Sequence, residues 1–153
     1  MSTQGLLRIA SIIALLFGIG HTLGYPWVGD VSTQQFDQIS AVKSITTVTQ
    51  GFLRSYWDFH IGFGITISLL FLVQAIIFWQ LSSFGQSEPK SARFVAALFG
   101  VFYIACTVVN FMFFFWAPII CSAILSACLV TASMRAPATT CPRPTGPQRG
   151  GVP

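Results

Sequence analysis

Four long apolar segments constrain the fold of this chain more than any other feature. An α-helix needs about 20 apolar residues, within a range of roughly 17–25, to cross the hydrocarbon core of a bilayer. The segments comprise residues 6–25, 57–81, 94–116 and 118–134. Pro118 suits the first turn of the last segment, because an amide hydrogen there has no helical partner. We therefore predict an all-α integral membrane protein, a four-helix bundle formed by residues 1–135.

The composition favours a bilayer over water as the environment of the chain. Of the 153 residues, 54% are hydrophobic and 8% are charged, whereas a soluble domain has about 25% charged residues. The mean hydropathy is +0.72, and a soluble domain of this size cannot bury so much apolar surface. The net charge of +4 comes without a nucleic-acid-binding motif, so no nucleic-acid partner is expected. The first segment is expected to remain as a span, because no A-x-A-like cleavage site follows it.

Lysine and arginine residues are distributed unevenly between the two sides of the predicted spans. Only Lys43 and Arg54 lie between the first and second spans. The six on the opposite side are Arg8, Lys90, Arg93, Arg135, Arg143 and Arg149. Because positively charged loops stay in the cytoplasm, both termini are predicted to be cytoplasmic, and residues 28–56 are predicted to form an outer loop. Residues 136–153 are rich in proline and glycine, which predicts a disordered tail.

The outer loop contains a segment with helical periodicity. Its apolar residues Phe36, Ile39, Val42 and Ile45 recur at helical spacing, and Ser32 with Gln35 has the spacing of a capping box. Two interpretations remain open at this point. The segment is either a short amphipathic helix on the outer membrane surface or a loop packed over the mouth of the bundle.

Several polar residues lie within or beside the predicted spans, where ionisable groups need partners or water. Asp58 and His60 begin the second span, and the spacing of Arg54 and Asp58 permits an i,i+4 pair. From the predicted helix bounds, His21 and His60 are expected at the same membrane depth. The complete predicted cluster in the outer half of the membrane contains His21, Tyr25, Arg54, Trp57, Asp58, His60 and Asn110.

Small residues predict which helix faces pack together, since they allow close approach in lipid. In the first span Ala10, Ala14 and Gly18 share one face, which His21 continues. The second span carries two such stripes, Asp58-Gly62-Thr66 and His60-Gly64-Ser68, which predicts helical neighbours on two sides. Such faces serve packing within one chain and between chains, so a homo-oligomer or a partner membrane protein is compatible with the sequence.

Three interpretations of the polar cluster remain open. It is structural and orients the helices, or it forms a pocket for a small or lipid-like ligand. Alternatively, His21 and His60 ligate haem b from both sides, or bind a divalent metal together with Asp58. A hydrolase triad lacks support, because no serine lies in a G-x-S-x-G turn, and an enzymatic function is not favoured. A channel or transporter is not favoured either, because Gln74 is the only strongly polar mid-span residue in the inner half.

Two motifs resemble those of a group of small bacterial four-span membrane proteins. They are Gly20-His21-Thr22-Leu23-Gly24 at the end of the first span and Arg54-Ser55-Tyr56-Trp57-Asp58-Phe59 at the start of the second. The resemblance implies a four-span fold in a bacterial cytoplasmic membrane, and it implies no activity or cofactor. In the group the position of His60 is expected to be aromatic, so His60 departs from its pattern.

Overall fold

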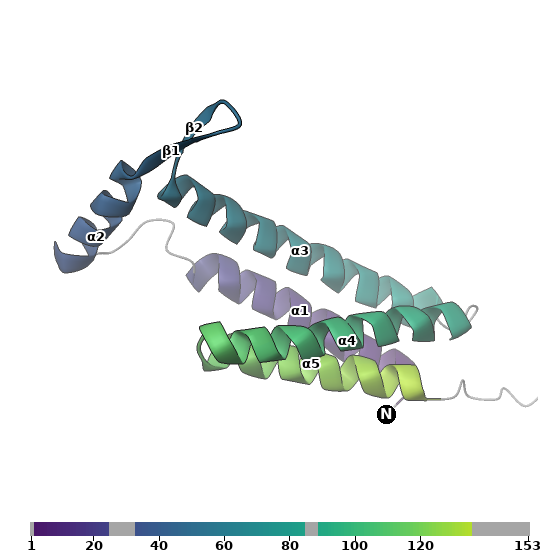
Figure 1. Ribbon diagram of the computed structural model, residues 1–153. Helices are drawn as coiled ribbons and strands as arrows, with labels where there is room; N and C mark the ends of the chain where they lie inside the picture. Colours follow the sequence, from purple (N-terminus) through teal and green to yellow (C-terminus); the bar gives the residue numbers. More distant parts are fainter. Residues whose placement is uncertain (1, 25–32, 85–88, 136–153) are drawn as a thin grey trace, which may run out of the picture.

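The computed structural model describes residues 2–24, 33–84 and 89–135, and in them it has five helices and one β-hairpin (Figure 1). The elements are α1 (Thr3–Gly24), α2 (Thr33–Ser44), β1 (Thr46–Thr49), β2 (Phe52–Ser55), α3 (Tyr56–Phe84), α4 (Pro89–Phe113) and α5 (Trp116–Met134). By length and composition α1, α3, α4 and α5 can each cross a membrane. This confirms the predicted helical bundle. Tyr25 and the predicted tail lie outside the described residues.

The predicted helix bounds need one correction of substance, at the reversal between α4 and α5. The sequence placed that reversal at residues 116–118, whereas the turn is Phe114–Phe115 and α5 starts at Trp116. Pro118 lies inside the first turn of α5, where its missing amide hydrogen costs no helical bond. The other end of α4 also differs from the predicted segment, which began at residue 94. The helix begins at Pro89, because the polar residues before the apolar segment are helical as well.

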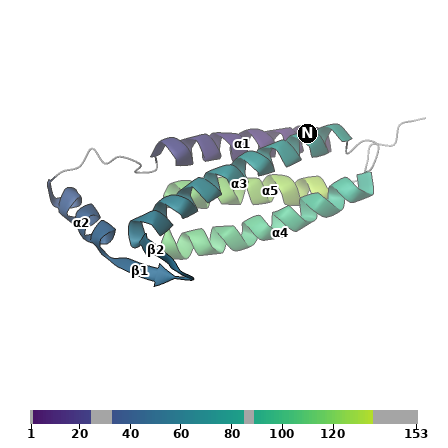
Figure 2. The same cartoon turned by 90° about the horizontal axis from the view of Figure 1, so that it is seen from above.

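The four long helices form two antiparallel pairs, α1 with α3 and α4 with α5, and α1 packs against α5 to join them (Figures 1 and 2). Leu7, Ala10, Phe78, Leu125 and Leu129 lie in the buried core between them. The helices α3 and α4 meet near their connection, where the Phe78 and Phe99 ring centroids are 5.1 Å apart in an edge-to-face contact. Tyr103 also donates its hydroxyl hydrogen to Gln74 Oε1 there. The apolar side chains exposed around the bundle suit contact with lipid.

A glycine allows close approach within each antiparallel pair. A Cβ atom built on Gly18 would lie 2.9 Å from Cβ of Phe71, so α1 and α3 touch directly there. A Cβ on Gly100 would lie 2.8 Å from Cγ2 of Val130 and 3.3 Å from its backbone nitrogen, between α4 and α5. The small residues at Ala10, Ala14 and Gly18 are buried, which confirms the packing face predicted for the first span.

The segment before α3 is more regular than the sequence suggested. Residues 33–44 form the helix expected from the apolar spacing, although the predicted cap at Ser32 lies outside the described residues. The strands β1 and β2 then pair from Thr46↔Ser55 to Thr49↔Phe52. Gln50 and Gly51 have φ values of 52° and 86°, as a two-residue type I′ hairpin turn requires. A hydrogen bond from the Tyr56 amide to the Ile45 carbonyl at 3.2 Å connects the hairpin base to α3.

Candidate functional site

Asp58 closes the first turn of α3 in a reciprocal cap with Ser55. The Ser55 amide donates to Asp58 Oδ2 at 2.8 Å, and the Asp58 amide donates to Ser55 Oγ at 3.1 Å. The Ser55 hydroxyl also donates to Asp58 Oδ2, at 2.9 Å. This is a capping box, which satisfies amides that the helix itself leaves unpaired. One carboxylate oxygen of Asp58 therefore serves the start of the helix.

Arg54 does not form the predicted i,i+4 pair with Asp58, because it precedes α3 and lies in β2. Its Nη1 donates to the Leu53 carbonyl at 3.1 Å, and its guanidinium carbon lies 5.6 Å from the centroid of the Phe52 ring. In the described part of the chain, the two charged groups thus hydrogen-bond to other partners and not to each other.

His21 contacts α3 through a group of hydroxyls. Its Nδ1 lies 3.2 Å from Ser68 Oγ, and Ser68 in turn donates to the Gly64 carbonyl at 3.1 Å. When the hydroxyl hydrogen of Ser68 is used in that bond, its oxygen accepts from His21 in the tautomer that carries a hydrogen on Nδ1. The Thr22 hydroxyl lies 2.9 Å from Ser68 Oγ and 2.8 Å from the Gly18 carbonyl. These contacts confirm that His21 continues the packing face of α1.

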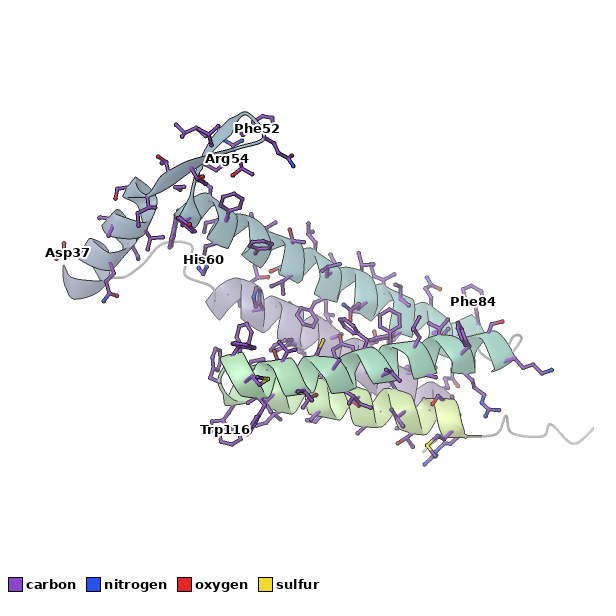
Figure 3. The ribbon with its side chains drawn as sticks, in the orientation of Figure 1. Asp37, Phe52, Arg54, His60, Phe84 and Trp116 are labelled. Carbon is purple, nitrogen blue, oxygen red and sulfur yellow. The ribbon has the colours of Figure 1, made fainter. Side chains whose placement is uncertain are left out.

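His60 lies in a different environment. Its side chain is exposed, and its ring centroid is 5.3 Å from that of Trp57. Nζ of Lys43 in α2 lies 5.2 Å from the centroid of the Trp57 ring, which is a cation–π contact between α2 and α3. Figure 3 shows His60 near the start of α3. Lys43, Trp57 and His60 thus belong to the rim where α2 meets α3.

The expectation that His21 and His60 lie at the same depth is wrong. His21 meets Ser68, which follows His60 by eight residues on α3. At 1.5 Å per residue, that separation is about 12 Å along the helix axis. Helix α3 starts above the end of α1, so equal distance from a predicted span end does not mean equal depth. No group of three His, Cys, Asp or Glu side chains that could hold a metal ion occurs among the described residues.

Asn110 belongs to the other helix pair. Its Nδ2 donates to the Pro118 carbonyl and to Ser122 Oγ, both at 3.2 Å. Thr107 also donates to Ser122 Oγ at 3.0 Å, and Ser122 donates to the Pro118 carbonyl at 2.7 Å. Asn110 therefore connects α4 to α5 by hydrogen bonds next to the turn between them. The predicted cluster divides into separate local arrangements on α1–α3, on the start of α3 and on α4–α5.

An open groove lies between α1 and α3. Its volume is about 370 Å³. The walls come from α1 and α3: Leu15, Gly18, Ile19, Thr22, Leu23, Ile65, Ser68, Leu69 and Leu72. The hydroxyls of Thr22 and Ser68 are its polar groups. Thr22 donates to the Gly18 carbonyl, and Ser68 donates to the Gly64 carbonyl and contacts His21 Nδ1. The groove therefore presents an almost entirely apolar surface.

Sequence reasoning missed Ser55 and Thr22 as organising residues of this region, and it placed Ser68 on a packing face without identifying its hydrogen bonds. The signal for Ser55 was present, since Ser-x-x-Asp before an apolar run is a capping box. No comparable signal marked Thr22, because serine and threonine in membrane helices commonly bond to their own backbone.

No protein-family model matches the chain, and comparisons with curated proteins and with solved structures gave no significant similarity.

Proposed function

We propose that this chain is a multi-pass protein of the bacterial cytoplasmic membrane that holds the hydrocarbon chain of a lipid-like ligand between α1 and α3. The groove between these two helices carries the proposal. Its volume of about 370 Å³ lies within the range of roughly 300–1,000 Å³ that is usual for small-molecule sites. The role is that of a binding protein, without a catalytic step.

The chemistry of the groove selects the part of the ligand that it takes. Leu15, Ile19, Leu69 and Leu72 supply aliphatic walls, and the hydroxyl of Ser68 already donates to a backbone carbonyl. A polar headgroup would find few open donors here, whereas an acyl or isoprenoid chain loses no hydrogen bond by entering. The Gly18–Phe71 contact closes the floor of the groove, so the chain lies on the helix pair and does not pass between the helices.

The proposed orientation has both termini in the cytoplasm and residues 28–56 outside. The distribution of lysine and arginine supports it. The resemblance to small bacterial four-span proteins is consistent with the same membrane and the same number of spans. A reporter fused after Pro153 is expected to behave as a cytoplasmic protein, and periplasmic behaviour would contradict this orientation.

A photoactivatable fatty acid tests the ligand directly. With the protein in bacterial lipid, we expect cross-links to concentrate on the groove residues of α1 and α3. Leu72→Trp should fill the groove and reduce this labelling several-fold, whereas Ile104→Trp on α4 should not. The two residues are a matched pair, because Leu72 is 46% exposed and Ile104 is 50% exposed. Equal labelling of α4 and the groove in the unmodified protein would refute the proposed site.

A further inference from the structure

A second cavity lies beneath the hairpin, beside the first turns of α3. It has a volume of about 290 Å³. Its lining comprises Arg54 from β2 with Asp58, Phe59, Gly62, Phe63 and Thr66 from α3. Figure 3 shows Arg54 on the strand next to the start of α3, and Figure 1 shows the hairpin on the side of α3 away from α1. The cavity is thus separate from the groove between α1 and α3.

One of the two small-residue stripes predicted for the second span lines this cavity. Gly64 and Ser68 belong to the stripe that packs against α1. Gly62, in contrast, has nothing within 4 Å of an added Cβ, and Thr66 is exposed. A helical neighbour was predicted on this side of α3, but no atom of the described residues lies within 4 Å of a Cβ added to Gly62, and α4 meets α3 elsewhere, near Phe78. The stripe containing Gly62 instead leaves room for a ligand beside α3.

Two opposite charges border the cavity without bonding to each other. The Arg54 guanidinium uses one N–H on the Leu53 carbonyl, and a guanidinium has five N–H donors in total. The Asp58 carboxylate directs Oδ2 to Ser55, while Oδ1 accepts no hydrogen bond within the described residues. The cavity therefore offers a donor fork and a carboxylate oxygen side by side, which suits a ligand that carries both charges.

The rest of the cavity is suited to hydrocarbon. Phe59 and Phe63 supply its aromatic walls, and Phe63 is 68% exposed on the outside of the bundle. The Thr66 hydroxyl donates to the Gly62 carbonyl at 2.8 Å, so it is not an open donor. A ligand here would have a charged end at Arg54 and Asp58 and an apolar end along α3.

We propose that this cavity binds a glycerophospholipid with a primary ammonium headgroup, with its phosphate on Arg54, its ammonium on Asp58 and its acyl chain along Phe59 and Phe63. Arginine suits this task because its planar fork binds a phosphate through two parallel hydrogen bonds. A primary ammonium can donate a hydrogen bond to the carboxylate, whereas a trimethylated ammonium has no N–H to donate. An anionic headgroup such as phosphatidylglycerol brings a phosphate for Arg54 but no cation for Asp58. The site thus selects a zwitterionic lipid with N–H donors.

Native mass spectrometry of the full-length protein in detergent tests this selection. The probes are phosphatidylethanolamine, its trimethylated analogue phosphatidylcholine, and phosphatidylglycerol, all with the same acyl chains. We expect phosphatidylethanolamine to bind about tenfold more tightly than either of the others, the factor that one charge-assisted hydrogen bond supplies. Equal binding of the three lipids would overturn the proposal.

Four variants assign the effect to this cavity. Arg54→Gln should weaken phosphatidylethanolamine binding about tenfold, and Asp58→Asn should remove the preference over phosphatidylcholine. Asn keeps an oxygen acceptor for the Ser55 amide, so the helix cap survives. Gly62→Leu should fill the cavity and abolish the preference, whereas Gly20→Leu, also without neighbours within 4 Å, should not. A preference that persists in both Arg54→Gln and Gly62→Leu would refute the site.

The two proposed sites fail independently. Leu72→Trp fills the groove between α1 and α3 and should leave the headgroup preference unchanged. Conversely, Gly62→Leu should leave the cross-linking of the groove unchanged. Loss of both signals in one variant, with intact folding by circular dichroism, would show that the two cavities are not separate sites.

Discussion

The α4–α5 pair and the α1–α3 pair are held by the same kinds of contact. They differ in how far along the helices those contacts extend. Each pair has one glycine at a close approach and hydroxyls that bond across the interface. Between α4 and α5, the Asn110 and Ser122 contacts extend to the turn at Phe114–Phe115. Between α1 and α3, the hydrogen bonds nearest the hairpin are those of His21 and Thr22 with Ser68, and α3 continues beyond its partner towards the hairpin. A short connection thus closes a helix pair, whereas a long one leaves room for grooves.

The largest effect should come from enlarging the glycine of the closed pair. In Gly100→Leu the new side chain meets both Cγ2 and the backbone nitrogen of Val130, so α4 and α5 must separate. We expect a loss of about 3 kcal/mol of stability, the upper part of the usual range for overpacking. Gly18→Leu should cost less, because Cβ of Phe71 is the one atom close to its added Cβ, at 2.9 Å, and its next neighbours lie 3.9 Å away.

Unfolding by sodium dodecyl sulfate, followed by circular dichroism, measures both changes. Gly20→Leu is the control, because nothing lies within 4 Å of its added Cβ. If Gly18→Leu proves more costly than Gly100→Leu, then α1–α3 and not α4–α5 is the more closely packed pair.

A smaller effect is expected from removing one hydroxyl in each interface. Ser122→Ala breaks bonds with Asn110, Thr107 and the Pro118 carbonyl, at a site that is 4% exposed. Because interhelical hydrogen bonds are worth about 0.6 kcal/mol on average, we expect a loss of about 1–1.5 kcal/mol.

Ser68→Ala is the matched change in the open pair. It should cost about 0.5 kcal/mol, since the Thr22 hydroxyl keeps its bond to the Gly18 carbonyl. The same unfolding measurement applies. Equal losses for Ser68→Ala and Ser122→Ala would contradict the difference between an open and a closed pair.

The start of α3 should depend on its own cap and not on packing against α1. Ser55→Ala removes the capping box with Asp58, which is worth about 1 kcal/mol. The amides of the first turn should then exchange with deuterium roughly five times faster, as such a free-energy change predicts. Ser83→Ala near the other end of α3, an exposed serine, is the control. Unchanged exchange would show that tertiary contacts hold this turn.

The smallest effect is expected from replacing His21 or His60, measured as a change in the absorption spectrum after haem is added. Because Ser68 and not His60 lies opposite His21, added haem should give no histidine-dependent Soret band in the purified protein. His21→Ala and His60→Ala should give the same spectrum as the unmodified chain. A Soret band that disappears in either variant would mean that α3 slides along α1 to bring the two histidines together.

Local sequence signals were sufficient for the helices but not for the polar residues. The four apolar runs predicted α1, α3, α4 and α5 with ends that differ by a few residues, because polar residues such as those after Pro89 extend a helix past its apolar part. The Gln50-Gly51 turn and the Ser55–Asp58 cap are also local features that the sequence carries. The grouping of His21, Asp58, His60 and Asn110 into one cluster failed, since that required the relative heights of the helices.

The sequence alone determined that this chain forms apolar helices of membrane-spanning length, because helix periodicity and hydrophobicity act within one segment. Only the tertiary structure decided that His21 faces Ser68, that Asn110 clasps α4 to α5, and that the face of α3 bearing Gly62 stays open. The physical reason is that two apolar helices can slide past each other by several residues at little cost in hydrophobic burial. A few close contacts, such as Gly18 on Phe71, fix the height at which they pack.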